Sequence, residues 1–301
     1  MKKKNIYRGI ISLILLLGCF LYTYYLDSSN NIENDNISKR VINEDSSSGY
    51  LKVYYLDVGQ ADSILIDCNQ KYMLIDAGNN EDGKLLVDYF NSLGIKKFDY
   101  VIASHPHEDH IGGMDDIINN FSIDNFYMPD VITTTKTYED LLDALENVQL
   151  SVYTPNAKDT FLLDNSSVQI LYVGNDEGNL NDASIVLKLT FGKEKFLFMG
   201  DASEKVEKEI LNKDLESDVL KVGHHGSQYS TSLKFLEKVS PKYAIISVGK
   251  DNSYNHPHDI VLNRLSKIGS RVYRTDIDGT ILITSDGNSL NFSNILTNTD
   301  G

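Results

Sequence analysis

Hydrophobic residues after position 50 fall into short runs, and each run ends at Gly, Asp or Asn. Leu51 to Val58, Ser63 to Asp67 and Lys71 to Asp76 are rich in branched and aromatic residues, which predicts three antiparallel strands. From Gly83 to Leu93 the apolar residues recur every three or four positions, which predicts a helix that ends near Gly94. The region therefore begins with strand hairpins and continues with a helix.

Strand-like and helix-like segments alternate through the rest of this region. Phe98 to Ala103 is predicted as a strand that leads into a group of histidines. Further strands are expected at Val168 to Val173, Ser184 to Phe191, Lys195 to Met199, Val219 to Val222, Tyr243 to Val248, Arg271 to Arg274 and Thr280 to Thr284. Further helices are expected at Tyr138 to Asn147, Ser203 to Asn212, Leu233 to Val239 and Asp259 to Ile268. Hairpins followed by alternation indicate an α+β domain in which helices cover a mixed sheet.

A different pattern occupies the N-terminus, where four basic residues precede a charge-free apolar stretch from Gly9 to Leu26. At roughly 18 residues the stretch is long enough to span a bilayer and longer than a usual signal-peptide core. We expect residues 1–26 to form an uncleaved membrane anchor, with the rest of the chain outside the cytoplasm, because positive charge precedes the stretch. Two other interpretations stay open, a cleaved signal peptide and a lipoprotein processing site at Leu16 to Cys19, and both export the chain.

Residues 27–49 are rich in Asn, Ser, Asp and Glu, with only scattered apolar residues. Such a composition cannot bury enough apolar surface to fold, so we expect a disordered linker. The folded domain is expected to cover residues 50–297. The chain thus divides into an anchor or signal segment, a linker and one domain.

Charge narrows the classes of partner. The formal net charge of −15 argues against broad binding to DNA or to an anionic membrane face, because both depend on many Lys and Arg side chains. Any contact with nucleic acid would have to be local. The two cysteines, Cys19 and Cys68, do not form a disulfide framework, since the first lies in the apolar stretch.

The clearest chemistry lies between Ser104 and Gly113, where the sequence reads SHPHEDHIGG at the end of a predicted strand. Three imidazoles and two carboxylates within six positions suit zinc, manganese or iron, and the lack of thiolate argues against a structural zinc site. A single histidine at a strand end is usually a hydrogen-bonded surface residue. Three histidines followed by Gly112 and Gly113, which let a helix start close by, favour a metal site instead.

At this point the chain resembles the metallo-β-lactamase superfamily, whose hallmark is His-x-His-x-Asp-His after a strand. The resemblance implies a four-layer αββα sandwich that holds two divalent ions, Zn²⁺ or Mn²⁺. By this resemblance His105 and His107 hold the first metal, and Asp109 and His110 hold the second. Glu108 fills a variable position and is expected to be a solvated charge.

Two aspartates match further motifs of that family. Asp76, in the sequence LIDAG, matches an early Asp-x-Gly turn that supports the site from beneath without binding metal. Asp201, in the sequence FMGD, stands at a strand end where the family has a carboxylate that bridges both ions. The resemblance therefore implies that Asp109 and Asp201 are both catalytic and metal-binding.

Later motifs narrow the resemblance to the ComEC-type branch, which includes the hydrolase domain of bacterial DNA-uptake proteins. They are the block from His224 to Ser227, the sequence DVGQAD from Asp57 to Asp62, and the sequence NDAS from Asn181 to Ser184. Together the motifs extend the resemblance from Leu51 to about Phe292. It is specific because several motifs agree in order, although each alone is common.

One departure from the family concerns the first metal, because no histidine lies between His110 and His224. Water or a later histidine would have to fill the open position. We expect His225 to complete the second metal, and His224 and His256 to act in catalysis by orienting substrate or stabilising developing charge. The choice among these three histidines for the metal sites stays open. His258 is expected to be a helix-start residue.

The function that follows is hydrolysis by two divalent ions. The leading hypothesis is an extracytoplasmic phosphodiesterase or nuclease, with DNA as a candidate substrate, the membrane contacted through the N-terminal segment, and no protein partner. Alternatives are a hydrolase of a cell-wall phosphodiester, such as a phosphocholine esterase, or of a β-lactam. A further alternative, of a different class, is a metal-binding surface module that has lost catalysis. Its only support is the missing middle histidine.

Overall fold

The computed structural model describes residues 49–175 and 178–295. The predicted anchor at residues 1–26, and the linker up to residue 48, lie outside the described residues. No helix within the described ranges is long and apolar enough to cross a membrane. The anchor and the domain boundaries therefore stay predictions from the sequence.

The first sheet has eight strands in the order β17-β16-β1-β2-β3-β5-β7-β8. Its first five strands pair antiparallel, and β3, β5, β7 and β8 pair parallel. The strands are β1 (Leu51–Tyr55), β2 (Ser63–Cys68), β3 (Lys71–Ala77), β5 (Tyr100–Ile102), β7 (Phe126–Tyr127), β8 (Val152–Tyr153), β16 (Thr280–Ser285) and β17 (Leu290–Ile295). A separate short ladder joins β4 (Lys97–Phe98) to β6 (Ser122–Ile123).

The second sheet has seven strands in the order β15-β14-β13-β12-β11-β10-β9. Strands β9 to β12 pair antiparallel, and β12 to β15 pair parallel, so this sheet is also mixed. The strands are β9 (Thr160–Leu163), β10 (Ser166–Tyr172), β11 (Val186–Phe191), β12 (Glu194–Phe198), β13 (Val219–Lys221), β14 (Tyr243–Ile246) and β15 (Arg271–Arg274).

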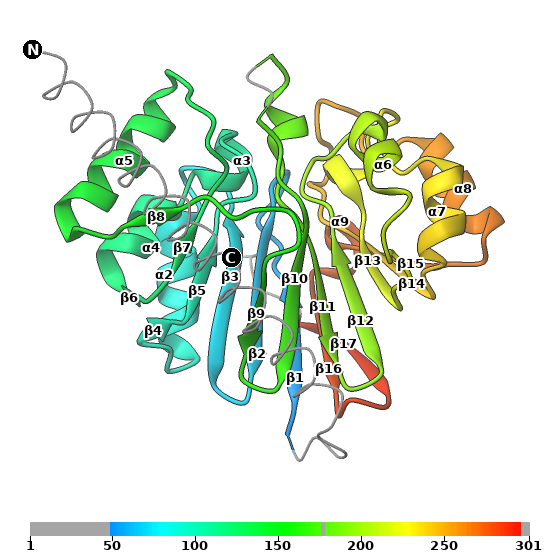
Figure 1. The fold of residues 1–301 in the computed structure, drawn as a ribbon, viewed down its shortest axis with the longest axis horizontal. Helices are drawn as coiled ribbons and strands as arrows, with labels where there is room; N and C mark the ends of the chain where they lie inside the picture. Colours follow the sequence, from blue (N-terminus) through cyan, green and yellow to red (C-terminus); the bar gives the residue numbers. More distant parts are fainter. Residues whose placement is uncertain (1–48, 176–177, 296–301) are drawn as a thin grey trace, which may run out of the picture. The chain divides into compact units, whose positions relative to one another are not determined.

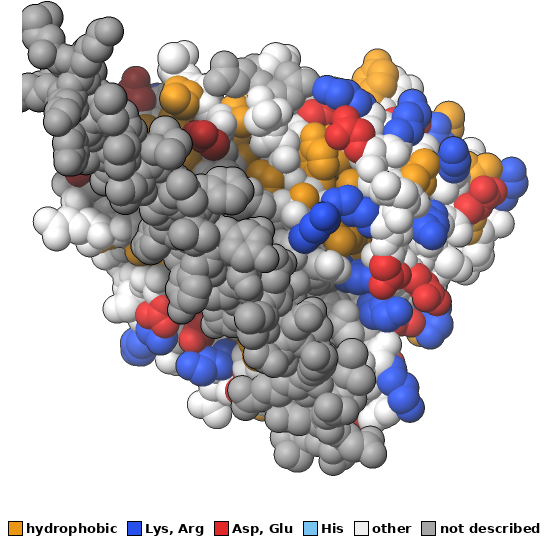
Figure 2. Space-filling view, in the orientation of Figure 1, with side chains coloured by type: hydrophobic (Ala, Val, Ile, Leu, Met, Phe, Trp, Pro, Cys, Tyr) orange, Lys and Arg blue, Asp and Glu red, His pale blue; other side chains and the backbone are white. Residues whose placement is uncertain are grey.

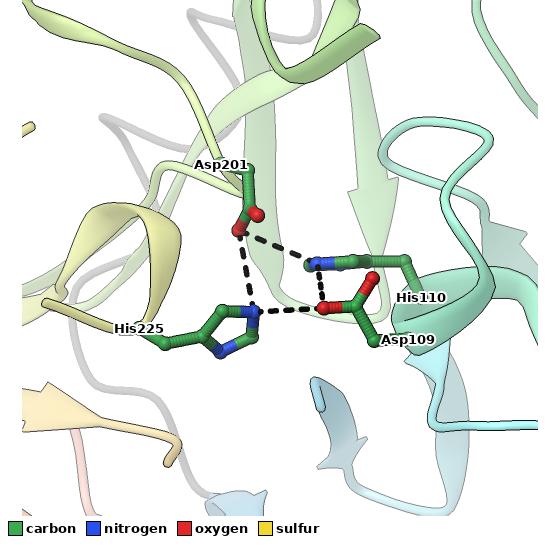
Figure 3. A group of neighbouring side chains, drawn as sticks. All are labelled: Asp109, His110, Asp201 and His225. Carbon is green, nitrogen blue, oxygen red and sulfur yellow. Dashed lines mark ion pairs between the residues drawn. The ribbon is translucent and has the colours of Figure 1, made fainter. Parts of the chain in front are cut away.

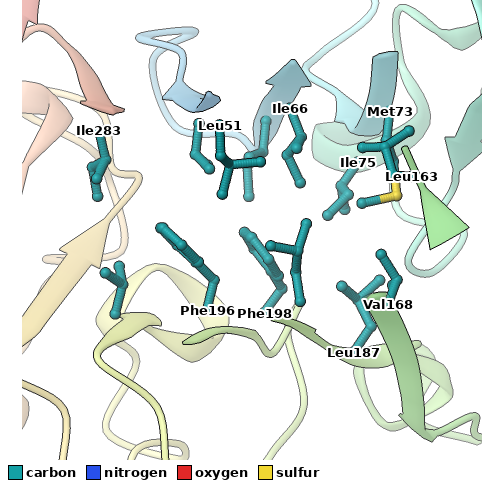
Figure 4. Close-up of a cluster of buried hydrophobic side chains, with 14 of the residues drawn as sticks. Leu51, Ile66, Met73, Ile75, Leu163, Val168, Leu187, Phe196, Phe198 and Ile283 are labelled. Carbon is teal, nitrogen blue, oxygen red and sulfur yellow. The ribbon is translucent and has the colours of Figure 1, made fainter. Parts of the chain in front are cut away.

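The two sheets pack face to face through side chains at alternate positions of their strands. In β1, Leu51, Val53 and Tyr55 belong to the core between the sheets, whereas Tyr54 packs on the opposite face. In β12, Phe196 and Phe198 join the same central core. Figure 4 shows side chains of both sheets pointing toward one another across this interface.

Helices cover the outer face of each sheet. On the first sheet lie α2 (Gly83–Ser92), α4 (Met114–Asn120) and α5 (Lys136–Val148), and on the second lie α6 (Glu204–Ile210), α7 (Leu233–Val239) and α8 (Asp259–Lys267). The short helices are α3 (Glu108–Ile111), α9 (Thr275–Asp278), η1 (Leu180–Ala183) and η2 (Gly223–Gly226). Figure 1 shows the order helix, sheet, sheet, helix, which confirms the α+β class and the four-layer αββα arrangement.

Several element boundaries differ from the predictions for identifiable reasons. The first strand ends at Tyr55, since the chain turns back after Leu56, whose amide still donates to the carbonyl of Ser63 at the start of β2. The strand expected at Phe98 to Ala103 is divided into β4 and β5 at Asp99, whose carboxylate accepts from the Tyr72 amide at 2.9 Å. The strand expected from Ser184 begins at Val186, since η1 occupies the preceding residues.

Candidate metal centre

The chemically interesting side chains meet at the carboxyl ends of the central strands. His105 and His107 follow β5, and Asp109 and His110 lie in α3 directly after them. Asp201 follows β12, and the turn η2 follows β13. Because carboxyl ends of neighbouring parallel strands meet at one edge, residues far apart in the sequence converge here.

One group of four side chains surrounds a common point, namely Asp109, His110, Asp201 and His225. The ligand atoms of this group all lie within 4.8 Å of one another. His110 Nε2 is 3.3 Å from Asp201 Oδ1, and His225 Nε2 is 3.3 Å from Asp109 Oδ2. Figure 3 shows that the four polar tips point toward one another from opposite sides.

Three atoms of this group are buried and have no hydrogen-bond partner, namely His110 Nε2, His225 Nε2 and Asp201 Oδ1. An unpaired buried polar atom costs about 1–3 kcal/mol, so three that face one another call for a common partner. Two imidazoles and two carboxylates form a donor set that suits zinc, manganese or iron. The residues present therefore fit a divalent ion at this point.

The far nitrogens of the two histidines are hydrogen-bonded, which sets the direction of the near ones. His110 Nδ1 lies 2.8 Å from Asp76 Oδ2, and His225 Nδ1 lies 2.9 Å from the carbonyl oxygen of Ser247. Each Nδ1 therefore donates its proton away from the centre, and each Nε2 is the ring nitrogen that faces the centre.

The second oxygen of Asp201 faces a different pair of histidines. Asp201 Oδ2 is 3.6 Å from His224 Nε2 and 3.9 Å from His105 Nε2. His107 Nδ1 lies 2.9 Å from the same His105 nitrogen. Three imidazole nitrogens thus gather on the Oδ2 side of Asp201, while the group of four gathers on its Oδ1 side.

The backbone of η2 directs the two neighbouring histidines to these two sides. His224 has φ 50° and His225 has φ 51°, a left-handed conformation that non-glycine residues rarely adopt. The two rings are 6.2 Å apart and inclined by 72°. With this left-handed backbone, the side chain of His224 reaches Asp201 Oδ2 and that of His225 reaches Asp201 Oδ1. The strained turn thus places two adjacent residues on the two sides of one carboxylate.

Asp76 lies beneath the centre and is fully enclosed. Its carboxylate accepts from the amide and the hydroxyl of Ser104, both at 2.7 Å, and from His110. Asp76 itself has φ 60°, as expected for the turn that the sequence LIDAG predicts. Its carboxylate therefore orients His110 and the strand end, in agreement with the supporting role that the sequence implied.

Burial and opposite charges set the pKa values of the central groups. Burial alone would raise the pKa of Asp201, but His110, His225 and His224 outweigh it and hold that pKa well below its usual value. Burial would likewise lower the pKa of His110, but Asp201, Asp76 and Asp109 raise it well above its usual value. Positive charge is thus strongly favoured between these carboxylates.

His256 borders the centre without joining either group. Its ring centroid lies 5.5 Å from that of His224 and 6.4 Å from that of His225. Burial first, and then the neighbouring histidines, lower its pKa to about 4. His256 is therefore neutral near pH 7. Next to it Tyr254, whose side chain is exposed, stacks on its ring at 5.6 Å.

The loop that carries His256 is held by one amide side chain. Asn252 Nδ2 donates to the carbonyls of Gly249 and His256 at 2.9 and 2.7 Å, and Asn252 Oδ1 accepts from the amides of Tyr254 and His256 at 3.1 and 3.0 Å. These bonds use every donor and acceptor of the Asn252 side chain. His258, next in the chain after Pro257, is the N-cap of α8, which confirms it as a helix-start residue.

A groove of about 740 Å³ begins beside the centre at Glu108. Four of its lining residues are acidic, namely Asp57, Glu81, Asp82 and Glu108, and none of the described residues that line it is Lys or Arg. Burial raises the pKa of Asp57 and that of Asp82. Glu108 is exposed and accepts from the Asn80 amide at 2.8 Å. The groove is thus acidic, and Glu108, one of its lining residues, directly precedes Asp109 in the chain.

Every residue that the sequence proposed for the site lies in or beside this centre. These residues are His105, His107, Asp109, His110, Asp201, His224, His225 and His256. Their roles as ligands or catalysts stay predictions. Sequence reasoning gave no role to Asp62 or Lys221, which form a buried ion pair at 2.7 Å below His225. The sequence did contain a signal for the pair, because Lys221 is a charged residue inside the otherwise apolar run Val219 to Val222.

Comparison with known proteins gives a family match that covers most of the domain. The profile of the family described as "Metallo-beta-lactamase superfamily" matches residues 56–250. Among solved structures, the metallo-beta-lactamase fold protein YhfI from Bacillus subtilis is similar with a TM-score of 0.52 and 11% identity. That similarity covers 82% of this chain and 100% of YhfI, and it supports the fold alone.

Two curated relatives are similar over most of this chain. "ComE operon protein 3" of Bacillus subtilis is 31% identical over 257 residues, which are 78% of this chain and 33% of that protein. "Competence protein ComA" of Neisseria gonorrhoeae is 29% identical over 231 residues, which are 75% of this chain and 31% of that protein. The chain therefore spans about a third of the length of these relatives.

Proposed function

This chain belongs to the metallo-β-lactamase superfamily, and from that membership we propose that it is an exported two-metal phosphodiesterase that acts on nucleic acid. The family and the His/Asp cluster identify a metal-dependent hydrolase related to competence proteins. Hydrolysis of a phosphodiester, the two ions and the place of action are our proposal. The similarity to a protein named a competence protein supports DNA as the substrate.

The observation that carries the proposal is the position of Asp201 between two groups of ligands. Its Oδ1 faces His110 and His225, and its Oδ2 faces His105 and His224. One carboxylate with a separate set of nitrogens on each oxygen is the arrangement that two adjacent divalent ions require. It supports a shared carboxylate in a two-ion hydrolytic site.

We propose that His224, whose Nε2 lies 3.6 Å from Asp201 Oδ2, fills the open position at the first metal. We assign His105, His107 and His224 to the ion on the Oδ2 side, and Asp109, His110 and His225 to the ion on the Oδ1 side. The assignment gives each ion two ligands from the segment of residues 105–110 and one histidine from η2. The assignment argues against a module that has lost catalysis, because that alternative rested on the missing middle histidine.

When bound, a pair of divalent ions activates water and stabilises the attacking and leaving oxygens of a phosphodiester. The chain supplies the surrounding groups. His256 is neutral at pH 7 and lies beside His224, where its ring can donate a hydrogen bond to a phosphoryl oxygen or to the leaving group. Asn252 holds the backbone of His256 in that position.

Contact with a nucleic acid must be local, because the net charge of the chain is −15. On the face in Figure 2, basic and acidic side chains are intermixed over the region of α6 to α8. We therefore propose that the ions and the adjacent neutral histidine provide most of the attraction for phosphate. A short single strand or a strand end suits such a site better than a long duplex.

An activity panel tests the proposal. The purified full chain in detergent, loaded with Zn²⁺ or Mn²⁺, is incubated with single-stranded DNA, duplex DNA, RNA and bis-p-nitrophenyl phosphate. We expect cleavage that ends on addition of EDTA and is lost in the Asp201→Asn variant. If every substrate stays intact with both metals while two ions bind per chain, the metal-binding module is the correct interpretation. Nitrocefin is tested beside these substrates, and its turnover without cleavage of any phosphodiester would replace the phosphodiesterase by a β-lactamase.

The acidic groove favours one second candidate, a cell-wall phosphodiester with a cationic substituent such as phosphocholine. Four carboxylates without a lining Lys or Arg would attract an ammonium group and repel a polyanion on that side. Asp57 and Asp82 are half-buried, so their attraction is less screened by water than that of surface carboxylates. The groove thus offers a place for a cation next to the scissile phosphate.

Paired substrates separate the two candidates. We compare p-nitrophenylphosphorylcholine with bis-p-nitrophenyl phosphate in the wild type and in the Asp57→Asn variant. If the groove binds a substrate cation, the variant raises KM for the choline ester and leaves KM for the other ester unchanged. If the variant changes KM for both esters equally, the groove does not bind a substrate cation, and nucleic acid stays the proposed substrate class. Protease accessibility on intact cells tests the proposed extracytoplasmic position.

A further inference from the structure

A buried ion pair joins the two sheets directly below the metal centre. Asp62 precedes β2 of the first sheet, and Lys221 ends β13 of the second. Lys221 Nζ lies 2.7 Å from Asp62 Oδ2, and the exposed fractions of the two side chains are 1% and 2%. Lys221 also donates to the carbonyl of Val222 at 3.1 Å. Neither residue faces a substrate, so the pair has no part in the hydrolytic chemistry described above.

Asp62 contacts two of the segments that hold ligands of the Oδ1 side, those of Asp109 and His225. Its amide donates to the carbonyl of Asp109 at 3.0 Å, and its own carbonyl accepts from the amide of Gly78, two residues after Asp76, at 2.9 Å. Its Oδ1 atom is buried without a hydrogen-bond partner and lies 3.5 Å from His225 Nδ1. One residue therefore borders Asp109 through its backbone and His225 through its side chain.

Stability alone does not account for this pair. Burying two charges is expensive, and replacement of a buried ion pair by apolar residues of similar size is often neutral or stabilising. The carboxylate oxygen that Lys221 leaves free is instead directed at a metal-facing histidine. A carboxylate next to the far nitrogen of a histidine ligand orients the ring and strengthens it as a ligand.

We propose that Asp62 and Lys221 are positioning residues for the ion on the Oδ1 side of Asp201. Asp62 Oδ1, together with the carbonyl of Ser247, attracts the Nδ1 proton of His225 and so directs Nε2 at the ion. The amide of Asp62 donates to the carbonyl of Asp109 and so holds the backbone of this second ligand in place. Lys221 offsets the charge of Asp62 and holds the carboxylate in place. This inference rests on the proposed two-ion site.

Metal titration tests the inference without any substrate. The metal-free full chain in detergent is titrated with Co²⁺, and the visible absorption band gives the number of ions and two dissociation constants. In Asp62→Asn we expect one constant to rise by about 10–100-fold while the other stays as in the wild type. In Asp62→Glu, which restores the carboxylate, we expect part of the loss to be recovered.

Two further variants distinguish positioning from folding. Lys188→Met breaks another ion pair of the second sheet, Lys188 with Asp214, also at 2.7 Å and with a buried lysine. It is expected to lower the unfolding temperature and to leave both Co²⁺ constants unchanged. The double variant Asp62→Leu with Lys221→Met removes both charges at once. It is expected to fold with a wild-type unfolding temperature and still to bind one Co²⁺ weakly.

The possible failures are distinct. A wild type that binds fewer than two Co²⁺ ions refutes the two-ion site of the proposed function. If the wild type binds two ions and Asp62→Asn binds both with wild-type constants, the positioning role is wrong. It is also wrong if the double variant regains both constants, because the pair would then serve stability alone. Loss of both constants together in Asp62→Asn would contradict the restriction to one side of Asp201.

Discussion

The two halves of the sandwich hold their parts of the metal centre in different ways. In the first half, His105, His107, Asp109 and His110 follow one another within six positions, at a strand end and the first turn of α3. His107 has ordinary extended backbone angles, with φ −89° and ψ 150°. This half therefore takes its four ligands from one short segment, which Asp76 and Asp62 support from neighbouring strands.

The second half brings its ligands from two separate turns and adopts strained backbone. Asp201 follows β12, and His224 and His225 follow β13 with φ near +50°. The amide of His224 donates to the carbonyl of Gly200, which ties the two turns together. Among the residues assigned to the ions, left-handed backbone occurs at His224 and His225 of the second half, whereas in the first half it occurs at Asp76, which supports His110.

The largest expected effect comes from Asp201, the residue that this comparison makes common to both ions. Asp201→Asn keeps the size of the side chain and removes its charge. We expect hydrolysis to fall by at least about 10³-fold, because charge stabilisation at the reacting centre is lost. Initial rates with bis-p-nitrophenyl phosphate measure this. A fall smaller than that caused by Glu108→Gln, at an exposed neighbour, would contradict a shared role.

Close packing in the first half predicts the next effect. A Cβ on Gly112 would lie 2.1 Å from the carbonyl carbon of Asn79, although the backbone angles of Gly112 suit any residue. A Cβ on Gly223, its counterpart in the second half, would meet nothing closer than 3.2 Å. We expect Gly112→Ala to lower the free energy of unfolding by about 2 kcal/mol or more and Gly223→Ala by less than about 1 kcal/mol. Urea unfolding in EDTA checks the order.

Backbone strain can be compared directly between the halves. At His224, glycine accepts the left-handed conformation better than alanine does, so we expect His224→Gly to be more stable than His224→Ala by about 1 kcal/mol. At His110, inside the helix α3, the backbone is right-handed, and the glycine variant should be the less stable by about 0.5–1 kcal/mol. Unfolding of the four metal-free variants measures both differences. If the glycine variant were the more stable one at both positions, or the less stable one at both, the two halves would not differ in backbone strain.

The smallest expected effect concerns His256, whose pKa in the folded chain is about 4. An unfolded histidine has a pKa of about 6.5, so between these values the unfolded chain binds more protons, and stability falls as pH falls. The full shift corresponds to about 3.4 kcal/mol, but the side chain is partly exposed, so we expect about 1 kcal/mol. Metal-free wild type should lose that much more than His256→Gln between pH 7 and pH 4.5. If the wild type and His256→Gln lose the same stability, the acid sensitivity comes from groups other than His256.

The sequence predicts the two halves unequally for the same physical reason. The ligands from His105 to His110 lie in one continuous segment, so the sequence pattern places them together, although Asp76 and Asp62 then orient two of them. Whether His224 lies beside His225 or on the other side of Asp201 depends on left-handed angles that the sequence pattern does not encode. The pair of Asp62 and Lys221 depends on contact between two sheets, which becomes visible only when the sheets are packed.

Element prediction has a similar limit. The longer strands and the amphipathic helices were predicted because a periodic pattern needs several residues to show itself. The strands β7 and β8 have two residues each and were missed, because such a length carries no period. β17 was also missed, since polar and apolar residues are mixed along Leu290–Ile295. The family resemblance gave the αββα order, which periodicity alone left as a single mixed sheet.

The loop held by Asn252 has a consequence for how this hydrolase can be changed. The side chain of Asn252 makes all of its hydrogen bonds with the backbone of Gly249, Tyr254 and His256. The conformation of the loop therefore depends largely on bonds within the loop. The loop carries no residue that we assign to an ion. It is therefore a suitable unit for exchange between relatives: grafting another loop between Gly249 and Pro257 should alter substrate preference and leave the two-ion centre intact.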